Sequence, residues 1–333
     1  MRYSLILAAL MAALTAGPTA RQPNPSALVI AFASKQGPNW DIFLAEPDGG
    51  PQTQLTRDPS NERFPVWSPD RHHIAYGSER EGAWELWVME ADGGNAHRLT
   101  RDIVAKSPRS WSPDGSRIVF ESERDGNAEI YVVAVADGQV TRLTTNPGED
   151  RSPAWSPDGS KIAFVSARDG KSDVWVMNPD GTQQEPITSG GTTQGGSSPA
   201  WSPDGRRIAF TSTQNGQRDI HVVTIAGRRV DQLASGAANE HWPIWSPDGA
   251  RLAFQSVRGE NYDLEVIDAD GRNRTRLTVT PQYDGQHSWS ADSRLLAFIS
   301  GRSGQDALYI IRPDGKGLRA VSEKPSLDPR WSP

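Results

Sequence analysis

The sequence predicts an all-β protein, a seven-bladed β-propeller made of four-stranded antiparallel blades. Tryptophans recur along the chain at nearly constant spacing, each is followed by serine and turn residues, and segments rich in β-formers lie between the turns. The repeat tryptophans are Trp67, Trp111, Trp155, Trp201, Trp245, Trp289 and Trp331, which places successive members 44, 44, 46, 44, 44 and 42 residues apart. A period of about 40 to 50 residues is typical of propeller blades.

One repeat, from Arg151 to Ser189, contains four short β-rich segments: SPAWS, KIAFVS, DVWVMN and EPITS. The first two are joined by SPDG at Ser156–Gly159, and the last two by NPDG at Asn178–Gly181. Both are tight turns, because proline sets the first φ angle, aspartate hydrogen-bonds to its own backbone and glycine accepts positive φ. Each repeat is therefore expected to form two linked hairpins, and neighbouring blades to bury each other's faces.

The two ends of the repeat array complete one blade. The VIAF segment at Val29 has no WS segment before it, and the last WS segment, Asp328–Pro333, has no IAF segment after it. We therefore expect the C-terminal strand to close the ring as the innermost strand of the N-terminal blade, whose other strands come from residues 28–56. The propeller should form a single domain over residues 27–333.

Residues 1–20 have the layout of a secretory signal peptide, with Arg2 before an apolar run from Leu5 to Leu14 and small residues after it. The run is too short to span a bilayer, and we expect cleavage between Ala16 and Ala20. The chain has no cysteine, which excludes disulfides, thiolate zinc sites and a lipoprotein anchor. We therefore expect a periplasmic or secreted monomer whose mature chain does not insert into a membrane.

The charge pattern and the missing motifs exclude several function classes. The net charge is −6, and lysine and arginine are interspersed with acidic residues, so we expect no nucleic-acid partner. The sequence contains no GxSxG nucleophile elbow and no Walker or Rossmann glycine pattern. We expect no cofactor, and the sequence favours a protein that is not an enzyme.

Together the repeated WSPDG, IAFxSxRxG, DIYVM-like and NxDGxxxxRLT segments resemble the TolB-like propeller family, which has WD40-like repeats. The resemblance covers nearly the whole chain after the signal peptide. It implies the propeller fold, here without the α/β domain that precedes the propeller in TolB proteins. Such repeats occur in binding proteins, lyases and the regulatory domains of peptidases, so the resemblance implies no single function.

Propeller geometry places the SPDG and NPDG turns at one rim and the more variable connections at the other. Four and five residues before the repeat tryptophans, the sequence places charged residues that should ring the mouth of the central channel. They include Glu62, Arg63, Asp150, Arg151, Glu240, His241 and Asp284. Carboxylates, arginines and a histidine suit a polar or charged ligand. The alternative is a solvated rim whose charges pair with one another.

Aromatic residues occupy the same variable rim. Trp40, Trp84 and Trp242 fall in its loops, and Trp40, Trp84 and Tyr262 share one register just before a third strand. Such rings suit stacking on sugars or anchoring a peptide, although they could equally pack on a neighbouring blade. The SxRxG segments, in contrast, are interpreted as a hydrogen-bond set within each blade.

His287 joins His241 near the predicted mouth, in the adjacent blade. Together with Gln286 the two histidines resemble the His and Gln metal site of oligogalacturonate lyases. A third suitably placed histidine is missing, and two ligands rarely hold a metal tightly, so we expect no metal.

The sequence favours an exported, non-catalytic binding scaffold that recognises a peptide, protein or glycan of the envelope or extracellular space at the variable rim. The alternative is a polysaccharide lyase or hydrolase acting at the channel mouth. In that case Asp150, Glu240, His241 and Asp284 would supply the acid, the base or metal ligands.

Overall fold

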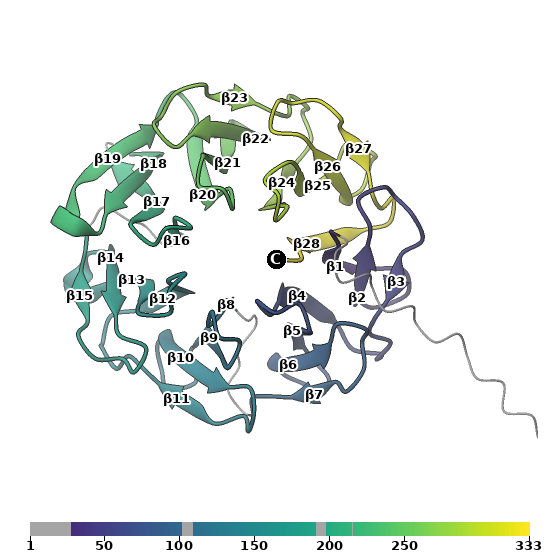
Figure 1. The fold of residues 1–333 in the computed structure, drawn as a ribbon, viewed down its shortest axis with the longest axis horizontal. Coiled ribbons are helices and arrows are strands. Elements are labelled where there is room, and N and C mark those ends of the chain that lie inside the picture. Colours follow the sequence, from purple (N-terminus) through teal and green to yellow (C-terminus); the bar gives the residue numbers. More distant parts are fainter. Residues whose placement is uncertain (1–27, 102–108, 191–197, 215) are drawn as a thin grey trace, which may run out of the picture.

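The computed structural model describes residues 28–101, 109–190, 198–214 and 216–333. Seven four-stranded antiparallel sheets stand side by side in a ring (Figure 1), which confirms the predicted fold class. The predicted signal peptide, residues 1–20, lies outside the described residues. None of the helices in this part of the chain has the length and apolar character needed to cross a membrane.

The strands of the first four blades follow the predicted repeat. The first blade contains β1 (Ile30–Ser34), β2 (Asp41–Ala45), β3 (Thr53–Gln54) and, from the other end of the chain, β28 (Ser326–Trp331). The second contains β4 (Glu62–Trp67), β5 (His73–Ser78), β6 (Glu85–Glu90) and β7 (His97–Arg98). The third contains β8 (Ser110–Trp111), β9 (Arg117–Ser122), β10 (Glu129–Ala134) and β11 (Val140–Arg142). The fourth contains β12 (Asp150–Trp155), β13 (Ile162–Ser166), β14 (Asp173–Met177) and β15 (Glu185–Pro186), with the short 3-10 helix η1 (Arg168–Gly170).

The remaining three blades repeat this order. The fifth contains β16 (Ala200–Trp201), β17 (Arg207–Gln214), β18 (Gln217–Thr224) and β19 (Val230–Ala234), with the 3-10 helix η2 (Ala226–Arg228). The sixth contains β20 (Asn239–Trp245), β21 (Arg251–Arg258), β22 (Asn261–Asp268) and β23 (Thr275–Arg276). The seventh contains β24 (Asp284–Trp289), β25 (Leu296–Ser300), β26 (Ala307–Ile311) and β27 (Arg319–Ala320).

The ring closes as the sequence predicts. Strand β28 pairs antiparallel with β1, with Trp331 opposite Ile30 and Ser326 opposite Ser34. The Ser332 amide donates to the Val29 carbonyl over 2.7 Å and extends this pairing by one step. Figure 1 shows β28, from the C-terminal end of the chain, beside β1 from the N-terminal end, on the inner side of the first blade.

Hydrophobic cores lie between neighbouring blades. The second strands carry fully buried phenylalanines, Phe32, Phe120, Phe164, Phe210, Phe254 and Phe298. In one core, Leu86 and Val88 of the second blade pack with Ile118, Phe120 and Tyr131 of the third. Burying each large apolar side chain contributes about 1.5 to 3 kcal/mol, so the blades stabilise one another.

The repeat tryptophans connect the blades by hydrogen bonds as well as by packing. The Trp111 indole Nε1 donates to the Val66 carbonyl of the preceding blade over 3.0 Å. The same bond recurs from Trp67, Trp201, Trp245 and Trp289 to the carbonyls of Arg330, Ala154, Ala200 and Ile244. In these five blades the acceptor spares a buried indole the cost of an unpaired donor.

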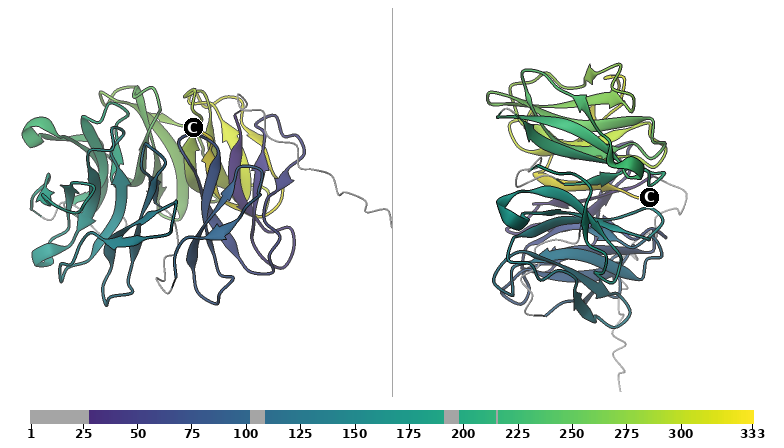
Figure 2. Two further views of the ribbon diagram at one scale, coloured as in Figure 1. Left: turned by 60° about the horizontal axis from the view of Figure 1, so that its bottom comes forward. Right: turned by 90° about the vertical axis from the view of Figure 1, so that its left-hand side faces the viewer.

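The SPDG turns form one rim, and the variable rim lies opposite. In the SPDG turn of the third blade, Asp114 accepts hydrogen bonds from the Ser112 hydroxyl at 2.5 Å and the Ser116 amide at 3.0 Å. These bonds lower the pKa of Asp114 to about 2. Figure 2 shows the ring from two further directions, with loops gathered at both ends of the strands. We call the end formed by the connections between blades, and between second and third strands, the variable rim.

Candidate functional site

Five of the described inner strands, β4, β12, β20, β24 and β28, are bulged just inside the variable rim. Their pairing with the second strands shifts register three residues before the repeat tryptophan, for example between Arg63 and Val66 of the second blade. Among the residues that the structure describes, five non-glycine residues at this position have positive φ: Phe64 (60°), Ser152 (55°), Trp242 (51°), Gln286 (48°) and Asp328 (55°). Bulges redirect side chains, and left-handed backbone at bulky residues is strained and typical of functional sites. The strain therefore marks this end of the inner strands as a candidate site.

A cation–aromatic stack spans the first and second blades at this rim. The Arg63 guanidinium lies 5.7 Å from the Trp40 ring centre and 4.6 Å from that of Phe64. Phe64 in turn contacts Trp84, with ring centres 5.6 Å apart. We call these four residues the Arg63 cluster. The structure thus brings together three of the predicted site residues, Trp40, Arg63 and Trp84.

The Arg63 cluster is partly open to solvent. Trp40, Phe64 and Trp84 are half-buried, and the Arg63 side chain is 24% exposed. Trp40 also packs against the core between the first two blades. One part of this side chain therefore packs inside the protein, and the other part lies at the surface of the variable rim. Sequence reasoning missed Phe64. Its position three residues before the repeat tryptophan, shared with Trp242, was the available signal.

A second aromatic group lies on the sixth and seventh blades. The His241 and Trp242 rings are 5.7 Å apart, and those of Tyr262 and Tyr283 are 5.5 Å apart. Trp242 is 43% exposed and Tyr262 is 36% exposed. Tyr283, which sequence reasoning also missed, is mostly enclosed, and burial raises its pKa to about 12. Trp242 and Tyr262 are therefore the open members of the second group.

Tyr283 explains a gap in the predicted ring of charged residues. Position 285, where other blades have Arg63, Arg151 or His241, is glycine. A Cβ atom there would overlap Gln255 Nε2 and the Tyr283 hydroxyl. The tyrosine therefore takes the space that a charged side chain occupies elsewhere.

The four predicted carboxylates lie inside the blades. Glu62, Asp150, Glu240 and Asp284 have no exposed surface. Each forms an ion pair within its own blade: Glu62 with Arg80 (2.6 Å), Asp150 with Arg168 (3.2 Å), Glu240 with Arg274 (2.7 Å) and Asp284 with Arg302 (2.9 Å). Burial raises the pKa of Glu62, Asp150 and Glu240, and the arginines partly offset this increase. The carboxylates thus hold the start of these four inner strands in place.

The arginines of the SxRxG segments complete this arrangement. Arg80 stacks on Trp87 at 4.5 Å, Arg168 on Trp175 at 4.4 Å, and Arg302 on Tyr309 at 5.0 Å. In these three blades the arginine follows its acid by 18 residues. A hydrogen-bond set within the blade is present, but the arginine pairs with the acid of the inner strand, while Glu85 and Asp173, which open the third strands, bond to Thr100 and Thr188. The constant spacing of 18 was the signal that links each arginine to the preceding inner strand.

The remaining predicted residues differ in exposure. Arg151 is half-buried and pairs with Glu149 (3.0 Å) and Glu123 (2.8 Å), and its hydrogen bond to Glu149 is the main cause of its raised pKa. His241 is half-buried, and burial lowers its pKa. His287 is only 6% exposed, and burial lowers its pKa to about 4. Both imidazoles are therefore neutral at pH 7.

Among the described residues, no group of three or more histidine, aspartate and glutamate side chains is arranged to hold a metal ion.

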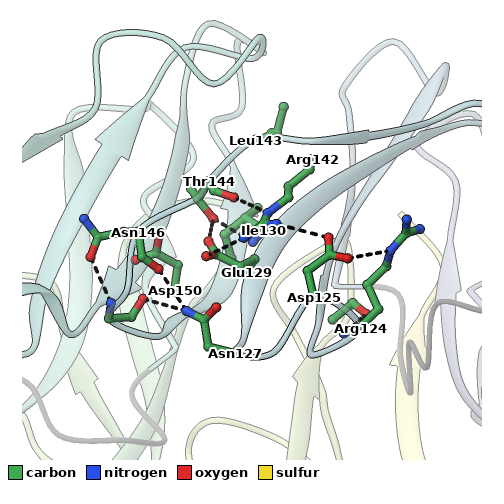
Figure 3. A network of polar contacts seen from close by, with 12 residues as sticks. Arg124, Asp125, Asn127, Glu129, Ile130, Arg142, Leu143, Thr144, Asn146 and Asp150 are labelled. Carbon is green, nitrogen blue, oxygen red and sulfur yellow. Dashed lines mark hydrogen bonds and ion pairs between the residues drawn. The ribbon is translucent and has the colours of Figure 1, made fainter.

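The loops that lead into the inner strands are held by the preceding blade. Figure 3 shows this in the third blade, where Asn127 Nδ2 donates to the carbonyls of Asn146 (2.9 Å) and Gly148 (3.1 Å). Arg142 pairs with Glu129 (2.9 Å) and Asp125 (3.1 Å) beside this loop. In the first blade, Asn39 donates in the same way to the carbonyls of Asp58 and Ser60. These bonds pre-organise the variable rim.

Solved structures share this fold. TolB from Acinetobacter baumannii superposes with a TM-score of 0.61 at 21% identity, over 92% of this chain and 66% of that chain. An oligogalacturonate lyase solved in complex with manganese gives a TM-score of 0.69 at 19% identity, over 85% of each chain. The oligogalacturonate lyase from Vibrio parahaemolyticus gives 0.69 at 16% identity, over 84% of this chain and 85% of that chain. At these identities the likeness concerns the fold alone.

This chain thus spans slightly less than two thirds of the A. baumannii TolB chain. Among curated protein sequences, none matches it significantly. The family model described as the TolB beta propeller domain (PD40) matches residues 102–197 and 197–333, well over half of the chain. With the repeat pattern and the closed ring of blades, this match shows that the chain belongs to the TolB beta-propeller family.

Proposed function

We propose that this protein is an exported binding module that recognises a peptide, protein or glycan through its variable rim. The Arg63 cluster carries this proposal. It is a continuous series of contacts among three aromatic rings and one guanidinium, partly exposed and built across two blades.

The cluster is organised before any ligand arrives. The Arg63 Nε donates to Asp328 over 3.0 Å, and Phe64 is fixed in positive φ by the bulge. Rigid aromatic side chains lose little conformational entropy on binding, and aromatic and arginine side chains dominate binding hot spots. The exposed Trp242 and Tyr262 extend the same kind of surface over the sixth blade.

The environment of the carboxylates supports binding over catalysis. Acid–base chemistry on a polysaccharide needs carboxyl oxygens that reach the substrate. Glu62, Asp150, Glu240 and Asp284 are fully buried and engaged by arginines. We therefore favour the binding module over a lyase or hydrolase.

The proposed place of action is outside the cytoplasm, in the periplasm or the extracellular space. Its support is the signal-peptide pattern of residues 1–20. N-terminal sequencing of the protein recovered from the periplasm and medium tests this part. An intact N-terminus on protein found only in the cytoplasm would contradict it.

Capture experiments test the binding function. The purified protein is immobilised and exposed to envelope extract and to a glycan array, alongside the variants Trp84→Ala and Trp242→Ala. Leu318→Ala is the matched control, because it removes an exposed apolar side chain (43%) next to the NxDG-type turn of the seventh blade, at the opposite rim. We expect the rim variants to lose the captured ligand and Leu318→Ala to retain it.

Assays for turnover address the alternative function. The protein is incubated with acidic polysaccharides, with and without divalent metal ions. Turnover that disappears in a folded His241→Ala variant would overturn the proposal of a non-catalytic module.

A further inference from the structure

The outer strand of the fifth blade is longer than its counterparts. Strand β19 contains five residues, Val230–Ala234. The described outer strands of the other blades contain two residues each, or three in the third blade. Proteins commonly keep exposed edge strands short, because the free backbone groups of a longer edge can pair with another chain. Strand β19 departs from that rule, and Figure 1 shows it on the outer circumference of the ring.

The free edge of β19 is open to solvent. Residues 226–232 are all exposed, and this run includes the apolar Val230, which is 39% exposed. On either side of it, the Arg229 and Asp231 side chains are 78% and 47% exposed. These two form an ion pair of 2.8 Å, because residues two apart lie on the same face of a strand. The edge therefore presents an apolar side chain flanked by one positive and one negative charge.

The hydrogen-bond pattern determines which backbone groups of β19 point outward. The Thr224 amide donates to the Arg229 carbonyl over 2.9 Å, so Arg229 belongs to a hydrogen-bonded pair with the third strand, β18. In an antiparallel ladder, successive residues direct their N–H and C=O groups alternately to the two sides. Val230 and Gln232 therefore direct these groups away from β18, and no loop or side chain in the described part of the chain bonds to them. The edge has free donors and acceptors at both residues.

This edge is complementary to a second copy of itself. In an antiparallel arrangement about a two-fold axis, Val230 lies opposite the partner's Val230, and each donates its N–H to the C=O of the other. The same register sets Arg229 opposite the partner's Asp231, and Asp231 opposite the partner's Arg229. Such non-hydrogen-bonded pairs have Cα atoms about 4.5 Å apart, which suits ion pairs between the side chains. A single register thus gives one apolar contact at the axis and two ion pairs beside it.

Charge disfavours the adjacent registers. Residues with outward-pointing backbone groups must face each other, so the pairing can slip only by two residues at a time. A slip in one direction places Arg229 opposite the partner's Arg229, and a slip in the other direction places Asp231 opposite the partner's Asp231. Like charges directly opposite each other destabilise a sheet. The charge order of β19 therefore specifies one register for self-pairing.

We propose that β19 is a homodimer interface, through which two copies of the chain join their fifth blades edge to edge into one continuous sheet. The partner is a second copy because the order Arg229, Val230, Asp231 is its own complement. Since the paired strands run antiparallel, the variable rims of the two copies face opposite directions. The interface is separate from the variable rim and independent of the function proposed above, and it replaces the monomer expected from the sequence.

Sedimentation velocity over a concentration series that reaches about 100 µM tests the dimer. An interface of one strand from each copy is small, so we expect a weak dimer with a dissociation constant on the order of tens of micromolar. Arg229→Asp places carboxylates opposite each other and should weaken dimerisation at least about tenfold. Combining it with Asp231→Arg reverses both charges and should restore the affinity to within about threefold of the wild type.

The matched control is Arg206→Asp, which makes the same change of charge at an exposed turn of the same blade and should leave dimerisation unchanged. The Arg229 and Asp231 side chains are also exposed, so their variants should fold. Far-UV circular dichroism checks the fold of each variant.

Disulfide cross-linking identifies the register. The chain has no cysteine, so a single introduced thiol reports on one position. In the proposed register the Cα atoms of the two copies lie about 5.5 Å apart at position 230, within the range of a disulfide, and more than about 12 Å apart at position 232. Under mild oxidation Val230→Cys should therefore form a covalent dimer at least about tenfold faster than Gln232→Cys.

Four results would overturn the proposal. A monomer throughout the concentration series would mean that a different chain, or none, pairs with β19. A dimer unaffected by Arg229→Asp, or no recovery in the double variant, would show that these charges do not face each other. Equal cross-linking at positions 230 and 232 would exclude the register.

Discussion

Arg63 and Asp328 form an ion pair, 3.0 Å from Nε to Oδ2, although 265 residues separate them in the chain. The pair joins the inner strand of the second blade to the strand that closes the first. Because Arg63 also stacks on Phe64, one guanidinium connects ring closure with the aromatic surface at the variable rim.

A double-mutant cycle measures this connection. Arg63→Ala should lower the free energy of unfolding by about 1 to 2 kcal/mol, since it removes a partly buried ion pair and a cation–π contact. Asp328→Asn keeps a side chain that tolerates positive φ and removes only the charge. We expect a coupling energy of about 1 kcal/mol between the two substitutions in urea denaturation. If the effects of the two substitutions on the free energy of unfolding were strictly additive, the ion pair would contribute nothing to stability.

Breaking the buried pair of Arg80 and Glu62 should lower the free energy of unfolding far more. Arg80→Met leaves the fully buried Glu62 carboxylate without its cation, and breaking a buried pair in this way typically costs about 3 to 5 kcal/mol. Arg98→Met is the control, because its partner Glu81 is 55% exposed and 3.7 Å away. Surface pairs of this kind contribute about 0 to 1 kcal/mol. Equal effects of the two substitutions in chemical denaturation would refute the structural role of the Arg80 pair.

The tryptophan hydrogen bonds between blades predict a difference between two similar substitutions. Trp111→Phe removes a bond of 3.0 Å and leaves the Val66 carbonyl without it. Trp331→Phe removes an equally buried ring whose Nε1 has no partner among the described residues. We expect Trp111→Phe to be the more destabilising by about 1 kcal/mol, the usual net contribution of a hydrogen bond. Thermal and urea denaturation of both variants provide the measurement.

His287 predicts a loss of stability in weak acid. Its pKa is lowered from 6.5 to about 4 in the folded protein, so between these values the unfolded chain binds more protons than the folded one. The free energy of unfolding should therefore fall as the pH decreases through this window, by up to roughly 3 kcal/mol from this residue.

The buried carboxylates have raised pKa values and act in the opposite direction, so the comparison must isolate His287. His287→Gln should show a flatter dependence of stability on pH than the wild type between pH 7 and 4. His97→Gln removes an exposed histidine and should leave the dependence unchanged. Parallel curves for His287→Gln and the wild type would contradict the prediction.

The fold could be predicted because its determinants are local and repeated. The turn chemistry of segments such as Ser156–Gly159, the spacing of the tryptophans and the unmatched segments at Val29 and Asp328 fix blade number and closure without any long-range information. The repeat also placed Trp40 and Trp84 at one register just before a third strand. The structure brings both rings to the cluster around Arg63.

The environment of the candidate site residues could be predicted less well. Sequence position placed Glu62 and Asp150 at the start of inner strands, but it did not show that arginines 18 residues later would enclose them. Phe64 and Tyr283 were missed because a bulge and a close approach to Gly285 set their directions, and both depend on three-dimensional packing.

The pairing of β28 with β1 also sets the order of events during synthesis. Val29 and Ser332, which hydrogen-bond to each other, are separated by 303 positions. At typical elongation rates of about 5 to 20 residues per second, β1 waits for its neighbour for a time on the order of tens of seconds. During that interval the nascent first sheet has an open edge, the kind of surface on which aggregation starts. Joining two such distant points costs about 5 kcal/mol of chain entropy, which makes this pairing a natural late step of folding. Once made, it leaves neither end of the ring as a free blade from which unravelling could begin.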